Sequence, residues 1–149
     1  MSLTISTALG DITLVLRPDA APQTVEYIKG VAGRGLYNGK TFYRSDFVIQ
    51  MGLHPEPCPL PNLPVNETHM HAKVSNTRGT AAVAHWDVPD CGNSEFFINL
   101  KSNGHLDSAY GGYCVFAEVK DDVSFTVVDA IANAVTAEGQ VKINTVTVA

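Results

Sequence analysis

The stretch KTFYRSDFVIQMG, residues 40–52, places one arginine inside a run of strand-forming residues. Aromatic and β-branched residues dominate the run, and these residue types favour extended structure. The sequence therefore predicts a strand from Thr41 to Gln50, with a bend around Ser45 and Asp46. A single arginine on an edge strand is usually an ordinary surface residue. A function for Arg44 must therefore be argued from the rest of the chain.

The composition indicates one globular domain spanning residues 1–149. Hydrophobic residues make up 45% and charged residues 17% of the chain, which argues against disorder. The formal net charge is -5 and the basic residues are scattered, so we expect no nucleic-acid partner. No apolar run approaches the roughly 18 residues of a membrane span, and residues 1–12 lack the features of a signal peptide. We expect neither a membrane association nor secretion.

The chain has three cysteines, Cys58, Cys91 and Cys114, and none of them forms a C-x-x-C pair. An odd number without such a motif is most simply explained by a reducing compartment, where thiols stay free. We therefore expect a cytoplasmic protein without a disulfide.

Short strand signals separated by turn residues run along the chain, a pattern typical of a barrel or a sandwich. Besides the stretch quoted above, strands are predicted at residues 3–7, 12–16, 80–84, 95–100, 113–119 and 141–148. Helical spacing of apolar residues predicts one helix at 22–33 and another at 124–134, with Ser124 as the expected N-cap of the second. Five prolines interrupt residues 53–77, so we expect a long ordered loop or a lid there.

Five segments carry a more specific pattern: GDITLVL (10–16), APQTVEYIKG (21–30), TFYRSDFVIQMG (41–52), NTRGTAAVAH with NSEFFINL (76–85 and 93–100), and HLDSAYGGYCVFAEV (105–119). In this order they resemble the cyclophilins, and most closely the short bacterial-type members with a single domain. The resemblance extends from residue 3 nearly to the end. It implies a closed antiparallel eight-stranded β-barrel capped by two α-helices, which the predicted strands and helices permit.

The resemblance also implies an activity, because cyclophilins are peptidyl-prolyl cis-trans isomerases. Such an enzyme catalyses rotation about X-Pro peptide bonds and assists protein folding. The implied partners are proline-containing peptides and unfolded or flexible protein segments. The implied enzyme is a monomer that needs no cofactor and no metal.

Site residues follow from the same resemblance, position by position. Arg44 corresponds to the family's catalytic arginine, and Gln50 to the glutamine beside it. The apolar floor under the substrate proline corresponds to Phe47, Val48, Phe97 and Leu106. The segment that pairs with the peptide backbone, and a position in the groove wall, correspond to Ala84, His85 and Tyr113.

The resemblance also places Glu95 and His105 among the substrate-binding residues, although these two positions and the spacing after Arg44 depart from the family's usual pattern. Glu95 stands where a glutamine is usual, and two outcomes are open: its carboxylate orients Arg44 by a bidentate pair, or it competes with the substrate for that arginine. Only two residues separate Arg44 from Phe47, so Asp46 can pair with the arginine. His105 replaces a frequent tryptophan that contacts cyclosporin, and we therefore expect weak cyclosporin binding.

Two other functions remain open from the residues. The first is a proline-peptide binding module, weakly active or inactive, that acts in a larger assembly. It differs from the enzyme in whether Arg44 is free to reach the substrate. The second is a zinc site formed by His69 and His71 with His54 or His85, but such spacing in a loop is a weak signal. We expect no metal site.

Overall fold

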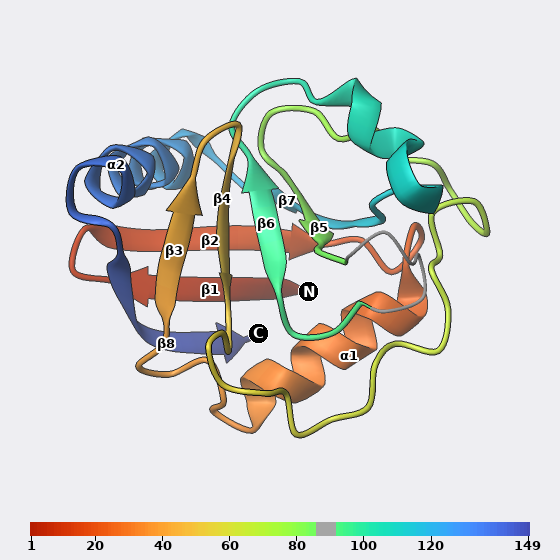
Figure 1. Ribbon diagram of the computed structural model, residues 1–149, viewed down its shortest axis with the longest axis horizontal. Coiled ribbons are helices and arrows are strands. Elements are labelled where there is room, and N and C mark those ends of the chain that lie inside the picture. Colours follow the sequence, from red (N-terminus) through yellow and green to blue (C-terminus); the bar gives the residue numbers. More distant parts are fainter. Residues whose placement is uncertain (86–91) are drawn as a thin grey trace.

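Strands from both ends of the chain lie side by side in a closed barrel (Figure 1). The computed structural model describes residues 1–85 and 92–149. Within them the strand order around the barrel is β1-β2-β7-β5-β6-β4-β3-β8, and neighbouring strands are antiparallel. The strands are β1 (Ser2–Thr7), β2 (Gly10–Leu16), β3 (Thr41–Ser45), β4 (Val48–Gly52), β5 (Thr80–Val83), β6 (Phe96–Asn99), β7 (Val115–Val119) and β8 (Val141–Val148). The expected eight-stranded antiparallel barrel is confirmed.

Alternating side chains fill the inside of the barrel. In β1, Leu3 and Ile5 are fully buried while their strand neighbours are partly exposed. Successive residues of a strand point to opposite faces, so one face of each strand supplies the core. The largest buried rings are those of Tyr37, Phe42, Phe96 and Phe116. The hydroxyl of Tyr37 donates to the carbonyl of Ser94 at 2.6 Å, so this buried polar group is satisfied.

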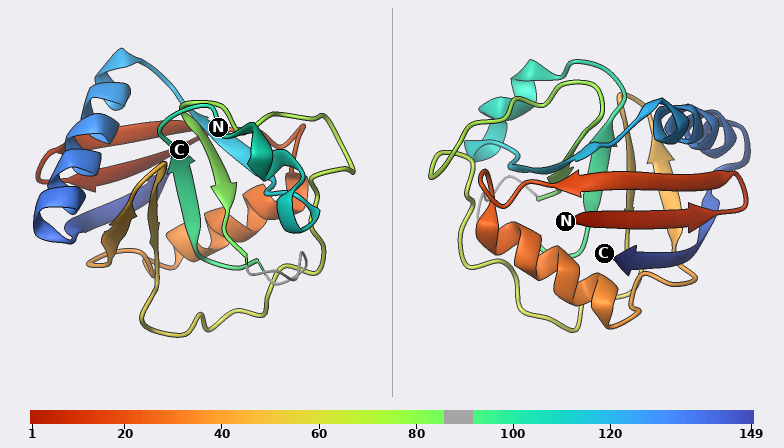
Figure 2. Two further views of the ribbon diagram at one scale, coloured as in Figure 1. Left: turned by 45° about the horizontal axis from the view of Figure 1, so that its top comes forward. Right: turned by 180° about the vertical axis from the view of Figure 1, so that it is seen from behind.

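Two helices cover opposite sides of the barrel (Figure 2). Helix α1 (Pro22–Gly33) packs against β7 and β8, and α2 (Asp122–Glu138) packs against β2, β3, β4 and β8. The N-cap of α2 is Asp121, whose carboxylate accepts from the backbone N–H of Ser124 at 2.9 Å, so the expected cap at Ser124 is wrong. The Ser124 hydroxyl instead accepts from the Thr13 N–H at 3.0 Å and ties α2 to β2. Among the described residues, no helix is both long enough and apolar enough to span a bilayer.

Residues 53–77 form a loop that is anchored to helix α1 by Glu67. The N-cap of α1, Ala21, has no side chain that could accept a hydrogen bond. The carboxylate of Glu67, which is fully buried, takes this role by accepting from the backbone N–H groups of Thr24 at 2.7 Å and Gln23 at 3.2 Å. A negative charge at a helix N-terminus is also favoured by the helix dipole. The loop and the helix therefore stabilise each other.

The single strand expected from Thr41 to Gln50 is wrong, because the chain reverses within it. Strands β3 and β4 form a hairpin that turns at Asp46 and Phe47. The backbone N–H of Asp46 donates to the carbonyl of Val48 at 3.0 Å, and its carboxylate accepts from the N–H of Val48 at 3.2 Å. The side chain of Asp46 thus stabilises the turn without a glycine or proline.

The hairpin contains a β-bulge next to the arginine. Phe42 pairs with Met51 and Arg44 pairs with Gln50, so Tyr43 is an extra residue in β3. A bulge sets two residues of one strand against one residue of its partner. As a result, Tyr43 and Arg44 both line the groove described below, although they are consecutive residues.

Candidate active site

A second apolar cluster lies outside the main core of the barrel. Its buried members are Val48, Ala82, Phe97, Leu106 and Val115. Strand neighbours such as Ile49 and Ile98 belong to the main core, so the alternation of strands β4 and β6 directs Val48 and Phe97 outward. A groove with a cavity volume of about 360 Å³ lies over this cluster. It is lined by Tyr43, Arg44, Phe47, Val48, Gln50, His54, Ala84, His85, Asn93, Glu95, Phe97, Leu106 and Tyr113.

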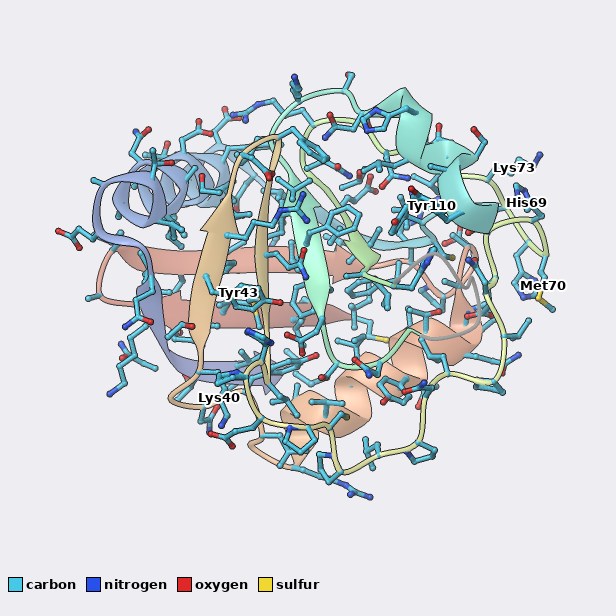
Figure 3. The ribbon with its side chains drawn as sticks, in the orientation of Figure 1. Lys40, Tyr43, His69, Met70, Lys73 and Tyr110 are labelled. Atoms are coloured by element: carbon cyan, nitrogen blue, oxygen red, sulfur yellow. The ribbon has the colours of Figure 1, made fainter. Side chains whose placement is uncertain are left out.

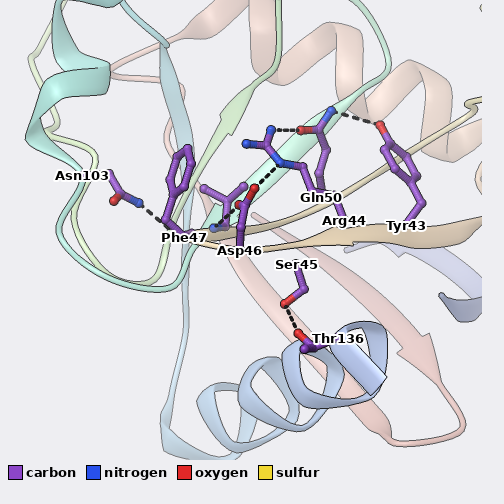
Figure 4. Close-up of polar contacts among 9 residues, drawn as sticks. Tyr43, Arg44, Ser45, Asp46, Phe47, Gln50, Asn103 and Thr136 are labelled. Carbon is purple, nitrogen blue, oxygen red and sulfur yellow. Dashed lines mark hydrogen bonds and ion pairs between the residues drawn. The ribbon is translucent and has the colours of Figure 1, made fainter. Parts of the chain in front are cut away.

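Arg44 stands in the wall of the groove and is held from three sides (Figure 4). Its Nε donates to the carboxylate of Asp46 at 2.9 Å, so the expected pair with Asp46 is present. Its Nη1 donates to the side-chain carbonyl of Gln50 at 3.0 Å, and its Cζ lies 5.2 Å from the ring centroid of Phe47. A guanidinium has five N–H donors, and the described residues occupy two of them. Arg44 is therefore oriented and still has donors for a ligand.

The hydrogen bonds continue from Gln50 away from the arginine. The amide nitrogen of Gln50 donates to the hydroxyl of Tyr43 at 3.0 Å, and this hydroxyl donates to Glu95 Oε1 at 2.8 Å. Figure 3 shows the Tyr43 ring lying over the β3–β4 hairpin. Among the ion pairs of the described residues, Arg44 pairs with Asp46 and not with Glu95. Of the two outcomes left open for Glu95, the bidentate pair with Arg44 is therefore not the one found between these two described residues.

Burial raises the pKa of Tyr43, and the neighbouring carboxylate of Glu95 raises it further. Both effects disfavour a phenolate, because one removes solvent and the other adds a negative charge nearby. The phenol therefore stays protonated and serves as a hydrogen-bond donor.

Glu95 is fixed by the backbone beside it as well as by Tyr43. Its carboxylate accepts from the backbone N–H groups of Leu53 at 2.7 Å and His54 at 3.2 Å, and from the Ser94 hydroxyl at 2.8 Å. A Cβ atom at Gly52 would overlap with this carboxylate. A glycine at position 52 is therefore required for Glu95 to reach its partners.

Two stacked rings, those of His85 and Tyr113, also line the groove. The imidazole of His85 lies 4.1 Å from the ring of Tyr113 at an interplanar angle of 11°. His85 Nε2 is 2.8 Å from the carbonyl oxygen of Gly112, and a carbonyl only accepts, so Nε2 carries a proton. Tyr113 also meets the floor residue Phe97 edge-on, with ring centroids 5.8 Å apart. This part of the groove lining is thus rigid and partly aromatic.

A short 3-10 helix, η1 (Gly104–Asp107), places Leu106 in the floor. Asp107, at its end, accepts hydrogen bonds from the Ser75 hydroxyl, from the Asn76 backbone N–H at 2.8 Å and from the Asn76 side chain at 2.9 Å. Burial by itself would raise the pKa of Asp107, but the hydrogen bonds from Ser75 and Asn76 outweigh it and hold the pKa below its usual value. The anchored carboxylate fixes η1 and with it the position of Leu106.

The residues predicted for the site come together, with one exception. His105 does not line the groove, but its ring lies 5.7 Å from that of Phe47 at the groove's edge. The sequence did not predict three further lining residues, Tyr43, His54 and Asn93. The bulge that directs Tyr43 into the groove has no signature in the sequence, and the other two belong to loops whose course the sequence does not define.

The residues considered for zinc are separated in the structure. His69 lies on the outer side of the 53–77 loop (Figure 3), whereas His71 Nε2 is 3.3 Å from the buried carboxylate of Glu67. Within residues 1–85 and 92–149, no three potential metal ligands gather at one place.

The thiols of Cys58 and Cys114 are free. Burial raises the pKa of Cys114 to about 12, which makes this thiol unreactive. Cys91 lies outside the described residues, so the count of three free thiols stays a prediction.

Comparison with known proteins gives one consistent family. The protein-family model described as cyclophilin type peptidyl-prolyl cis-trans isomerase/CLD matches residues 2–149 of this chain. Peptidyl-prolyl cis-trans isomerase B of Escherichia coli (strain K12) is 35% identical over 142 residues, covering 90% of this chain and 85% of that protein. A peptidyl-prolyl cis-trans isomerase of Acinetobacter baylyi is 33% identical over 140 residues, covering 87% of this chain and 70% of that protein.

Solved structures agree on the architecture. A cyclophilin type peptidyl-prolyl cis-trans isomerase of Cryptosporidium parvum, crystallised in the presence of the dipeptide Ala-Pro, superposes with a TM-score of 0.83. The match covers 100% of this chain and 99% of that one at 18% sequence identity. At that identity the likeness establishes the fold alone.

Proposed function

This chain belongs to the cyclophilin-type peptidyl-prolyl cis-trans isomerases, and we propose that Arg44 acts on an X-Pro bond whose proline lies on Phe97 and Leu106. The observation that supports this assignment most directly is the position of Arg44. Its guanidinium, oriented by Asp46 and Gln50, stands at the edge of an apolar floor. A charged donor beside an apolar pocket suits a ligand that is itself apolar with one polar reacting atom.

The floor has the chemistry to hold a proline ring. Val48, Phe97 and Leu106 present carbon atoms, and proline has no N–H group that would need a partner there. The Cryptosporidium parvum structure was obtained in the presence of Ala-Pro, which suggests the same kind of ligand for this groove. We propose proline-containing peptides and unfolded or flexible protein segments as the substrates.

The reaction needs no covalent intermediate. Rotation about an X-Pro bond is slow because resonance gives the C–N bond partial double-bond character. In the twisted transition state the imide nitrogen regains a lone pair, which an N–H donor of Arg44 can bind. The planar ground state offers no such lone pair, so this hydrogen bond lowers the barrier and does not merely strengthen binding.

Magnitudes limit what Arg44 alone can supply. Uncatalysed rotation takes about 10–100 s, and a turnover on the order of 10³ per second would require about 6 kcal/mol of transition-state stabilisation. One preorganised donor aimed at the charge that develops in the transition state supplies about 2.7–4 kcal/mol. Orientation of the peptide and exclusion of water over the apolar floor must supply the remainder.

An inactive binding module is not favoured. That alternative required Arg44 to be tied up by Asp46 and Glu95, but Glu95 bonds to Tyr43 and Asp46 occupies only the Nε side of the guanidinium. Among the residues that the structure describes, Gln50 is the hydrogen-bond partner of the Nη groups.

We propose three further properties that follow from the residues. The protein acts as a monomer, as the family resemblance implies. Its compartment is the cytoplasm, because an odd number of cysteines without a C-x-x-C pair is most simply explained by a reducing compartment. It binds cyclosporin weakly, because His105 offers a small ring at the groove's edge next to Phe47.

The test is an exchange experiment on a short X-Pro peptide. Two-dimensional NMR measures the cis-trans exchange rate with catalytic amounts of the protein, and titration of the same peptide measures its affinity. We expect exchange to be accelerated far above the uncatalysed rate. Peptide binding without acceleration would instead support the binding module.

A further inference from the structure

Glu95 is linked to Arg44 by a series of hydrogen bonds through Tyr43 and Gln50, and the donor and the acceptor of each bond in the series are determined. A carboxylate without a proton accepts and does not donate, and Glu95 already accepts from Leu53, His54, Ser94 and Tyr43. With about four acceptor sites filled by four donors, there is no room for a proton of its own. The Tyr43 hydroxyl must therefore point its hydrogen at Glu95.

The direction of the Tyr43 hydroxyl hydrogen determines the orientation of the side-chain amide of Gln50. Because the Tyr43 hydrogen is used, its oxygen faces Gln50 as an acceptor, and the amide nitrogen of Gln50 donates to it at 3.0 Å. The other end of the amide, the carbonyl oxygen, is then left for Arg44 Nη1 at 3.0 Å. In the reversed amide, an NH₂ group would face a guanidinium, and two donors would oppose each other.

We propose that Glu95 and Tyr43 are positioning residues that set the amide orientation of Gln50 and thereby aim Arg44 at the substrate. This deepens the proposed function and rests on the role assigned there to Arg44. Neither residue contacts the reacting bond in this scheme. Glu95, which the family resemblance placed in substrate binding, acts here through Tyr43 and Gln50.

Two features of the backbone are necessary for this arrangement. The bulge in β3 brings Tyr43 to the same side of the hairpin as Arg44, so that both can meet Gln50. Gly52 leaves the space that the carboxylate of Glu95 fills. A glutamine at position 95 has an NH₂ group that can donate to Tyr43, which would free the hydroxyl hydrogen to turn toward Gln50.

Two single variants and their combination test the scheme kinetically. Tyr43→Phe removes the hydroxyl and keeps the ring, while Glu95→Gln keeps the shape and adds a donor. Each should lower kcat about fivefold, the factor expected for the loss of one net hydrogen bond, with KM unchanged because the floor is intact. The double variant should lose no more than either single one, since all three break the same path.

A rescue separates this role from a merely structural one. Gln50→Glu in the Tyr43→Phe background places a carboxylate next to Arg44, and both of its oxygens accept. A carboxylate at position 50 presents an acceptor to Arg44 in either orientation, so Tyr43 is no longer needed to orient this side chain. Most of the lost kcat should therefore return. Tyr27→Phe serves as the matched control, because it removes a partly buried tyrosine hydroxyl from α1 that bonds to Cys58 outside the groove.

The side-chain N–H signals of Arg44 report the positioning without any assay of activity. They should shift in Tyr43→Phe and in Glu95→Gln, whereas those of Arg78, which is paired with Asp129, should stay as an internal reference. Unchanged Arg44 signals in both variants would overturn the proposal, and so would additive losses of kcat. If Arg44→Ala keeps the full rate, the catalytic role of Arg44 fails, and the signals still decide whether Glu95 and Tyr43 position it.

Discussion

Arg44, in strand β3, lies over the ring of Phe47 in the tight turn that follows, with its guanidinium carbon 5.2 Å from the centroid of the ring. The ring belongs to the lining of the groove, and Asp46 between the two residues bonds both to the arginine and to the backbone of the turn. The same short segment therefore supplies the charged donor, part of the apolar lining and the fixed distance between them. We therefore predict different effects on catalysis and on peptide binding for the loss of the Arg44 charge and for the loss of apolar surface in the groove.

Arg44→Ala is expected to slow catalysed exchange by about 10²–10³, as for the loss of a donor used in the transition state. Peptide affinity should change much less, because the floor is intact. Arg44→Lys should restore the rate only in part, since an ammonium cannot reproduce the planar donor array. Exchange NMR and peptide titration on the same samples measure both quantities.

Arg78→Ala is the matched control for this prediction. Arg78 also lies over a ring, 4.9 Å from the centroid of Phe125, and also pairs with a carboxylate, Asp129, but outside the groove. Its loss should leave the rate unchanged. A full rate for Arg44→Ala would show that Arg44 is structural.

Phe97→Ala should weaken binding and catalysis together. Phe97 is 3% exposed, belongs to the same buried cluster as Val48 and contacts the ring of Tyr113, so its removal leaves a cavity where the proline would rest. Unfolding in urea should also show a loss of about 3 kcal/mol, the usual cost of deleting a buried phenyl group. A variant that binds the peptide as tightly as the parent protein would place the proline elsewhere.

Asp107→Asn is expected to lower stability at neutral pH by about 1–2 kcal/mol, because Ser75 and Asn76 lose a charged acceptor. The pKa of Asp107 is lowered in the folded state, so its contribution is fully present above the unfolded value near 4. It is lost as the pH falls through the folded pKa. The difference in unfolding free energy between the variant and the parent, measured in urea, should therefore be larger at pH 7 than at pH 3.

Asp129→Asn provides the comparison for this pH dependence. Asp129 is exposed and pairs with Arg78 at the surface, where ion pairs contribute little. Its loss should change stability only slightly at either pH. An Asp107→Asn difference that is as large at pH 3 as at pH 7 would show that shape, and not charge, anchors η1.

His105→Trp should tighten cyclosporin binding by on the order of 1 kcal/mol or more, because an indole buries more apolar surface beside Phe47 and holds its N–H donor in a different geometry. Titration of the drug against both proteins measures the difference. Stoichiometric inhibition of the unmodified protein would contradict the expected weak binding.

The sequence predicted some elements better than others, for physical reasons. Residues 141–148 were predicted with the correct bounds, because β-branched residues alternate there with polar ones. The hairpin at 41–52 was missed because its turn, at Asp46 and Phe47, lacks the glycine or proline that usually marks one. The hydrogen bonds of Asp46 that stabilise this turn become visible only in three dimensions.

The site was predicted through the family resemblance far more than through residue chemistry. Apolar residues such as Phe97 and Leu106 look like core residues in a sequence, and only the barrel topology directs them outward. The partnership of Tyr43 with Glu95 joins residues 52 positions apart and depends on a bulge and on Gly52. The cap that Glu67 provides for α1 is equally non-local. No local pattern encodes such contacts.

The place of β8 between β1 and β3 has a consequence for how this protein can be made. Until residues 141–148 have left the ribosome, the nascent chain carries two unpaired strand edges, each able to pair with another chain. Chains truncated before β8 should therefore aggregate, and not only lack activity. A truncation series ending before and after β8, followed by light scattering, should show the transition from aggregate to soluble enzyme within these last residues.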